Sequence, residues 1–131
     1  MRAEKVVASL LNGAGPVTSI VGAKVFAVMG SQPEDAPFIV YWKDSADRDR
    51  VIAYNGPTIV RAVISVQCVA IDYPTLKSLG EAVRTSLLGQ FGDIAGVHVN
   101  EIQVAGEGPD LFDPEAQLFG QLWQFLIVHQ E

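Results

Sequence analysis

Long hydrophobic runs and cysteine pairs are absent from this chain of 131 residues. No uninterrupted apolar run exceeds five residues, as in VFAVM and FIVYW, so no segment is expected to span a membrane. Cys68 is the single cysteine, which excludes an internal disulfide and is compatible with a reducing compartment. The first residues begin with a positive charge, but Glu4 and Lys5 interrupt them, unlike in a signal peptide. We therefore expect the protein in a cytoplasm.

Charge is scarce and unevenly placed. Charged residues make up 18% of the chain against 49% hydrophobic residues, so part of the apolar surface is expected to meet a partner. The net charge of −6 argues against a nucleic-acid binder that neutralises phosphates. All nine Lys and Arg lie between Arg2 and Arg84, whereas residues 85–131 hold seven acids and no base. This asymmetry favours a basic partner surface or an anion to be repelled, with a solvated acidic face as the plain alternative.

Two periodic patterns meet at residue 72. From 60 to 70 apolar residues occupy every second position, which predicts a half-buried strand with Arg61, Ser65 and Gln67 on its other face. From 76 to 87 the apolar spacing becomes three or four, which predicts a helix. Asp72 or Thr75 can cap that helix, and a proline suits its first turn. The strand thus leads directly into the helix.

The remaining segments complete an α+β pattern. A helix is expected from Arg2 to Leu11, and strands are expected at 23–29, 38–42, 50–54, 96–106 and 117–129. Residues 43–49 are interpreted as a polar turn and 107–116 as an acidic loop. The order α-β-β-β-(β)-α-β-β predicts one domain over 1–131, with a mainly antiparallel or mixed sheet of four to five strands. Two helices would pack on one face and leave the other to solvent or a neighbour.

The sequence has no recognisable catalytic, cofactor or metal site. Cys68 lies at an apolar strand position and is expected to be a core thiol. His98 and His129 lack metal-pair spacing and are interpreted as ordinary strand histidines. The GxG pairs at 13–15 and 106–108 lack the third glycine of a nucleotide loop and are interpreted as turns.

A cluster of charges at 44–50 has the composition of a calcium loop but not its spacing. Asp44, Asp47 and Asp49 are not followed by the glycine and closing glutamate that such a loop needs. Arg48 and Arg50 neutralise part of the charge. A solvated turn is therefore the preferred interpretation.

Aromatic residues allow two interpretations. A stacking platform for a sugar or base is one, and core or interface packing is the favoured one, because the residues fall in expected strands. The residues are Trp42, Phe119, Trp123 and Phe125.

Four stretches carry a resemblance to a known family: MRAEKVVASLLNGAGPVTSIVGAKVFAV, APFIVY, GPTIVRAVISVQCVAIDYPTLKSLGEAVRTSLLG and LFDPEAQLFGQLWQFLIVHQ. Together they resemble tail-completion (tail-terminator-like) proteins of long-tailed phages and prophages, long catalogued as a domain of unknown function. The resemblance lies in the order and spacing of elements and covers nearly the whole chain. It implies a ring of six copies that caps the head-proximal end of the tail tube, stops its polymerisation and offers a docking surface for the filled head.

The resemblance also implies partners and a location. The partners would be further copies of the chain, the tail tube protein and a head-completion or connector protein, with DNA passing through the lumen without sequence-specific binding. The protein would be found in the host bacterial cytoplasm during assembly and in the virion tail afterwards. No enzymatic activity, cofactor, metal or membrane contact is expected.

The candidate interface consists of charged and polar residues in and around the segments 43–55 and 106–115. It comprises Asp44, Asp47, Arg48, Asp49, Arg50, Arg61, Gln67, Glu107, Asp110, Asp113 and Glu115. Carboxylates on a lumen wall would keep phosphates from sticking. Two other classes remain open: a dimeric adaptor that buries its spare sheet face, and a small-molecule-binding domain with Trp42 or Trp123 in a pocket.

Overall fold

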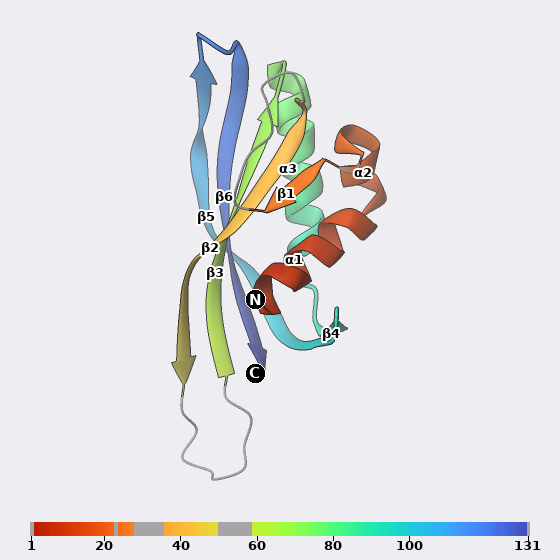
Figure 1. The fold of residues 1–131 in the computed structure, drawn as a ribbon, viewed down its shortest axis with the longest axis vertical. Coiled ribbons are helices and arrows are strands. Elements are labelled where there is room, and N and C mark those ends of the chain that lie inside the picture. The colour runs from red at the N-terminus through yellow and green to blue at the C-terminus, as the bar shows by residue number, and fades with distance from the viewer. Residues whose placement is uncertain (1, 23, 28–35, 50–58, 131) are drawn as a thin grey trace.

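The computed structural model describes residues 2–22, 24–27, 36–49 and 59–130, which form helices packed on one sheet (Figure 1). Six strands lie in the order β1-β2-β3-β6-β5-β4, and all neighbours are antiparallel except β1 and β2. The elements are α1 (Arg2–Gly13), α2 (Gly15–Val21), β1 (Val25–Ala27), β2 (Phe38–Asp49), β3 (Ile59–Ala70), α3 (Tyr73–Leu87), β4 (Gly92–Ile94), β5 (Val97–Asp113) and β6 (Leu118–Gln130).

The sheet is long and strongly twisted, with the helices on one side of it (Figure 1). The β5–β6 hairpin extends to one end of the molecule, and the β2–β3 pair extends to the other. β3 and β6 form the central pair, joined from Ile59↔Gln130 to Ala70↔Phe119. The two ends of the sheet therefore carry different sets of side chains.

The alternation in β3 is confirmed. Its even-numbered residues from Val60 to Ala70 are all buried and face the helices. They pack against apolar side chains of all three helices and of β6, among which Phe125 is fully buried. Burial of this face supplies most of the apolar area that holds the helices to the sheet.

The transition from β3 to α3 is also as predicted. Asp72 caps α3, because its carboxylate accepts a hydrogen bond from the Thr75 amide at 2.8 Å. Pro74 lies in the first turn, where no amide hydrogen is needed. The helix ends at Leu87, and Gly89 follows with φ of +79°, a left-handed conformation that suits glycine. The sequence therefore specifies both ends of α3.

Two segments interpreted as loops are strands. Residues 43–49 continue β2 beside β3, with a register shift between Lys43 and Ser45. β5 continues to Asp113, so the predicted loop at 107–116 is reduced to a short turn after that residue. Both segments lie in the outer parts of the sheet, where polar side chains can face water while the backbone pairs with β3 or β6. The polar residues of these two segments therefore reflect exposure to solvent and not an irregular backbone.

The number of elements also differs from the prediction. The described residues form three helices and six strands, where two helices and four to five strands were expected. The additional helix is α2, which begins at Gly15 with Pro16 in its first turn, so this proline starts a helix instead of marking a break. β4 is an additional short strand beside β5. The strand predicted at 50–54 lies outside the described residues.

Candidate interaction surface

The sheet face opposite the helices carries a second apolar cluster. Phe38 and Val40 alternate with the core residue Ile39 and therefore point away from the helices. Val69 lies opposite Phe38 in the register and completes the buried part of the cluster with Ala36. No described helix covers this face (Figure 1).

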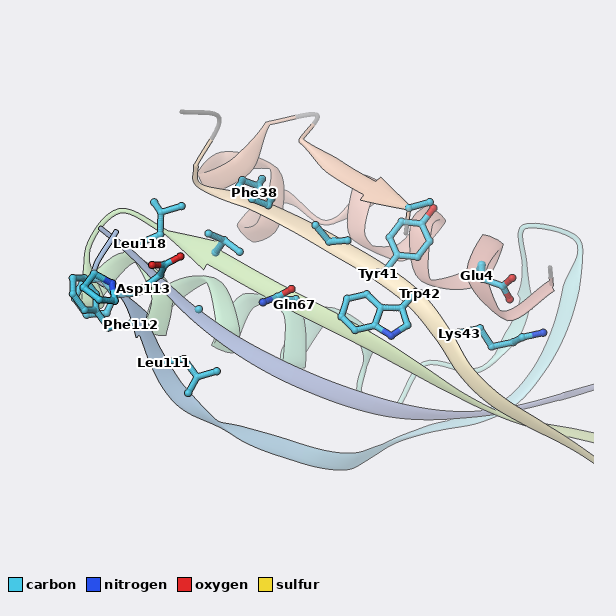
Figure 2. Close-up of a pocket in the computed structure, with 16 residues that line it drawn as sticks. Glu4, Phe38, Tyr41, Trp42, Lys43, Gln67, Leu111, Phe112, Asp113 and Leu118 are labelled. Carbon is cyan, nitrogen blue, oxygen red and sulfur yellow. The ribbon is translucent and has the colours of Figure 1, made fainter. Parts of the chain in front are cut away.

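A groove of about 1400 Å³ runs along this face toward the β5–β6 end (Figure 2). Its apolar lining includes Phe38, Val40, Trp42, Val69, Leu111 and Leu118. The polar side chains that line it are spread along its length, with Glu4 and Lys43 toward one end, Gln67 in the middle and Asp113 at the other end. Because these polar groups do not converge on one point, the groove suits an apolar protein surface better than a small ligand.

Asp44 joins three strands on the same face. One carboxylate oxygen accepts a hydrogen bond from Trp42 Nε1 at 2.9 Å, and the other accepts from Gln124 Nε2 at 2.9 Å and from the Ser65 hydroxyl. The hydrogen bond from Ser65 is the main reason that the pKa of Asp44 lies below its ordinary value. Ser65 was expected on an open face, but Asp44 and its neighbours bury it completely. The Asp44 carboxylate thus holds β2, β3 and β6 together.

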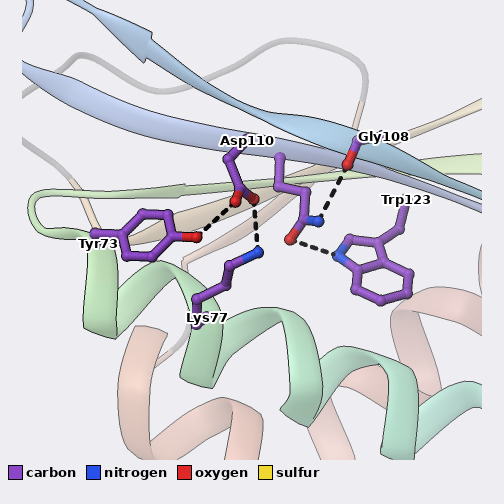
Figure 3. Close-up of polar contacts among 6 residues, drawn as sticks. Tyr73, Lys77, Gly108, Asp110 and Trp123 are labelled. Carbon is purple, nitrogen blue, oxygen red and sulfur yellow. Dashed lines mark hydrogen bonds and ion pairs between the residues drawn. The ribbon is translucent and has the colours of Figure 1, made fainter.

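Asp110 fastens the end of β5 to α3 (Figure 3). Its carboxylate accepts a hydrogen bond from the Tyr73 hydroxyl at 2.7 Å and from Lys77 Nζ at 2.8 Å. The bond from Lys77, more than that from Tyr73, lowers the pKa of Asp110. The same contact raises the pKa of Lys77. A residue predicted in an acidic loop is therefore held to α3 by two side-chain contacts.

A buried polar pair lies beneath this end of the sheet (Figure 3). The Gln121 side chain donates to the carbonyl of Gly108 at 3.1 Å and accepts from Trp123 Nε1 at 3.2 Å. Trp123 stacks on Phe125 with ring centroids 6.2 Å apart, and both are buried. The prediction that these two aromatic residues pack in the core is confirmed, whereas Trp42 and Phe119 line the groove.

The other candidate interface residues separate into two regions. Asp47 and Arg48 lie on β2, and Asp47 is opposite Arg61 of β3 in the register. Asp49 ends β2, and Arg50 lies outside the described residues.

The second region is the exposed, acidic end of the β5–β6 hairpin. It contains Glu107, Asp113 and Glu115, together with Asp110. The sequence predicts these four acids as interface residues, but it does not predict that they flank an apolar groove.

Exposed apolar residues are the feature that sequence reasoning missed. Ile71, Tyr73, Leu111 and Phe112 are exposed near the first turn of α3 and the end of the β5–β6 hairpin. Leu88 and Phe91 are exposed just after the last turn of α3, and Phe91 is 77% exposed. The sequence signals were an apolar LF pair inside an acidic segment and a Phe between two glycine-rich turns. Exposed large apolar side chains that gather in this way commonly mark interaction sites.

The cysteine and the histidines lie at separate places in the structure. Among the described residues, no three His, Cys, Asp or Glu side chains gather as a metal site. Cys68 is fully buried, and burial raises its pKa to about 12, which disfavours the reactive thiolate. His98 lies 3.0 Å from the Asp93 carboxylate, and His129 is buried in β6. No helix within the described ranges is long and apolar enough to cross a membrane.

Comparison with known proteins identifies the fold. No protein-family model matches the sequence, and no curated protein matches it. The solved structure "Virion of native gene transfer agent (GTA) particle" contains a chain with a TM-score of 0.69 and 16% sequence identity to this one. The match covers 96% of this chain and 92% of that chain. The protein therefore shares its α+β fold, over nearly its full length, with a chain of a gene transfer agent virion.

Proposed function

We propose that this protein is a non-enzymatic structural component of a phage or phage-like particle. The observation that carries the proposal is the full-length similarity of fold to a chain of a gene transfer agent virion. The shape of the surface supports it, because the apolar features are a wide groove and exposed ends, as expected for a protein that contacts other proteins. Its place would be the assembled particle, reached after assembly in the host cytoplasm.

Within the particle, the proposed role is that of a tail terminator. Six copies would form a ring on the head-proximal end of the tail tube, stop its polymerisation and present a surface to the head-completion or connector protein. A ring requires two different surfaces on each copy that bind each other head to tail. The unlike exposed surfaces at the two ends of α3 meet that requirement.

The acidic residues have a role in this proposal. DNA must pass through the ring without binding to it, and carboxylates repel its phosphates. Residues 85–131 supply seven acids and no base, and Glu107, Asp113 and Glu115 are exposed among them. These three carboxylates are the candidates for a lumen wall or for a rim that meets a basic partner.

A dimeric adaptor is the second candidate function. The observation that favours it is the uncovered groove, since two copies could bury this face against each other in a symmetric contact. Such a protein would associate no further than a dimer as its concentration rises, whereas a terminator would assemble into a larger ring. Sedimentation velocity measured over a range of concentrations separates the two.

The decisive experiment removes the gene from a phage or prophage that encodes this protein. We expect tail tubes of uncontrolled length and filled heads without tails, seen by electron microscopy, because no ring would end the tube. The wild-type gene should restore joined particles. Tails of normal length on joined particles in its absence would refute the terminator role.

A matched variant tests the acidic end separately. Replacing the three exposed acids together (Glu107→Gln, Asp113→Asn and Glu115→Gln) removes three charges while keeping side-chain size. Glu101→Gln, which removes the charge of an exposed acid on β5 outside the hairpin end, serves as the control. If the acids repel DNA or bind a basic partner, the triple variant should yield fewer joined particles than the control. Equal yields would exclude both roles for these acids.

A further inference from the structure

Two unlike apolar surfaces remain uncovered in one copy of the protein. The first is the groove on the outer sheet face, with the exposed Leu111 on its wall. The second protrudes from the turn between α3 and β4 and consists of Leu88 and Phe91, which we call the Phe91 corner. Leu111 is 59% exposed and Phe91 is 77% exposed. One surface is hollow and the other protrudes.

The two surfaces cannot meet within one copy. Tyr73, at the start of α3, contacts the groove residue Phe119 with ring centroids 6.0 Å apart. The Phe91 corner follows the other end of α3, whose 15 residues place it about 21 Å farther along the helix axis. Each surface is therefore available only to another molecule.

Charge favours contact between these two surfaces in particular. Arg84 precedes Leu88 by four residues, so both side chains lie on the same face of the last turn of α3. Its contact with Glu81, at 3.2 Å, is between exposed side chains and is a weak competitor. At the other end, Asp113 lines the groove and Glu115 follows it in the turn. Arg84 is thus the cation beside the protrusion, which also has the exposed Asp93 nearby, and two carboxylates lie at one end of the groove.

We propose that the Phe91 corner of one copy docks in the groove of the next copy, with Arg84 beside Asp113. The contact is head to tail, so every copy in a closed ring buries both of its exposed apolar surfaces. This inference rests on the proposed ring, because it names the contact that closes it. Apolar burial supplies most of the affinity, and the charges orient the approach.

Mixing two variants tests the proposal in solution. Phe91→Asp destroys the protrusion and Leu111→Asp places a charge on the groove wall, and both positions are exposed, so the fold should be retained. Sedimentation velocity in 1 M salt should show that each variant alone dissociates at least tenfold more readily than the wild type. An equimolar mixture should form one-to-one dimers and nothing larger, because it retains one intact protrusion and one intact groove. Ser78→Asp, exposed in the middle of α3 and outside the groove lining, is the control for the added charge and should associate like the wild type.

Crosslinking gives a second measurement that does not depend on loss of affinity. Gln90→Cys lies beside the protrusion and Asp113→Cys lies in the groove, while the native Cys68 is buried and should not react. A short bismaleimide should join the two variants when they are mixed and neither variant to itself.

Several results would overturn the proposal. They are a wild-type protein that stays monomeric at high concentration in 1 M salt, a mixture that fails to form dimers, and crosslinks within a single variant. A symmetric adaptor would give the last of these. The terminator role is tested separately. Variants that associate normally but leave heads and tails unjoined would contradict the terminator role and not this contact.

Discussion

The packing of α3 on β6 leaves little space for a side chain at Gly80. A methyl group added at Gly80 would lie 3.2 Å from Gln121 Oε1 and 3.2 Å from Trp123 Nε1. Both atoms are fixed, because Trp123 donates to Gln121 and Gln121 donates to the Gly108 carbonyl. Neither side chain can move by a few tenths of an ångström without weakening a buried hydrogen bond. We therefore expect Gly80→Ala to destabilise the protein.

The expected magnitude follows from two opposing effects. Alanine in a helix interior is favoured over glycine by about 1 kcal/mol. Overpacking a close-packed site costs roughly 1–3 kcal/mol. The net loss should be about 1 kcal/mol, which corresponds to a melting temperature lower by roughly 4 °C for a domain of this size. Thermal unfolding followed by circular dichroism can measure this difference.

Two control variants isolate the cause. Gly13 ends α1 and has nothing within 4 Å of an added methyl group, so Gly13→Ala should leave stability unchanged or slightly raised. In a Gln121→Ala background the crowding is relieved, and Gly80→Ala should then cost less than it does in the wild type. A Gly80→Ala protein that melts at or above the wild-type temperature would refute this reasoning.

Three further predictions concern the buried thiol, the Asp44 network and the net charge. Cys68→Ser should destabilise the protein more than Cys68→Ala, because a buried hydroxyl without a partner costs roughly 1–3 kcal/mol. Equal melting temperatures of the two variants, together with free reaction of Cys68 in the native protein toward a thiol reagent, would contradict its burial. Asp44 has a lowered pKa when folded, so its contribution to stability is present above the ordinary value of 3.8 and is lost as pH falls through the lower folded value. Asp44→Asn should therefore show a smaller loss of unfolding free energy in acid than the wild type, and identical acid titrations would contradict this. Each copy carries a net charge of −6, so like charges on neighbouring copies repel each other. Raising the salt concentration from about 0.1 to 1 M shortens the Debye length from about 10 to 3 Å and should therefore strengthen association. A ring that dissociates as salt rises would exclude repulsion between copies as the dominant electrostatic effect.

The elements that could be predicted from sequence are those whose own residues determine them. The alternation through β3 and the apolar spacing of α3 each report burial against a neighbouring layer, and Asp72 caps the helix locally. The short helix α2 was missed because Gly15 and Pro16 are typical of breaks, although proline is also favoured in a first turn. A local sequence pattern therefore predicted an element correctly only where that pattern is typical of a single kind of structure.

The candidate surface could not be predicted because it joins distant segments. Asp44 and Gln124 are 80 residues apart in sequence, and Asp110 meets Lys77 across 33 residues. The extension of β5 through an acidic segment depends on pairing with β6, for which the sequence of β5 alone gives no signal. The charge asymmetry, in contrast, can be read from the sequence, because seven acids and no Lys or Arg lie in residues 85–131.

The central position of β6 has a consequence for how the protein folds. β2 pairs with β3, and β5 pairs with β6, as neighbours along the chain, but β3 and β6 must find each other across α3, β4 and β5. Local hairpins close quickly, whereas pairing between distant strands is slow. Until β3 meets β6, each hairpin presents an unpaired inner edge that can recruit another chain. Before it can assemble through its specific surfaces, the protein therefore passes through a stage in which non-specific association of strand edges competes with folding. The yield of folded protein should rise when the chain is diluted during folding.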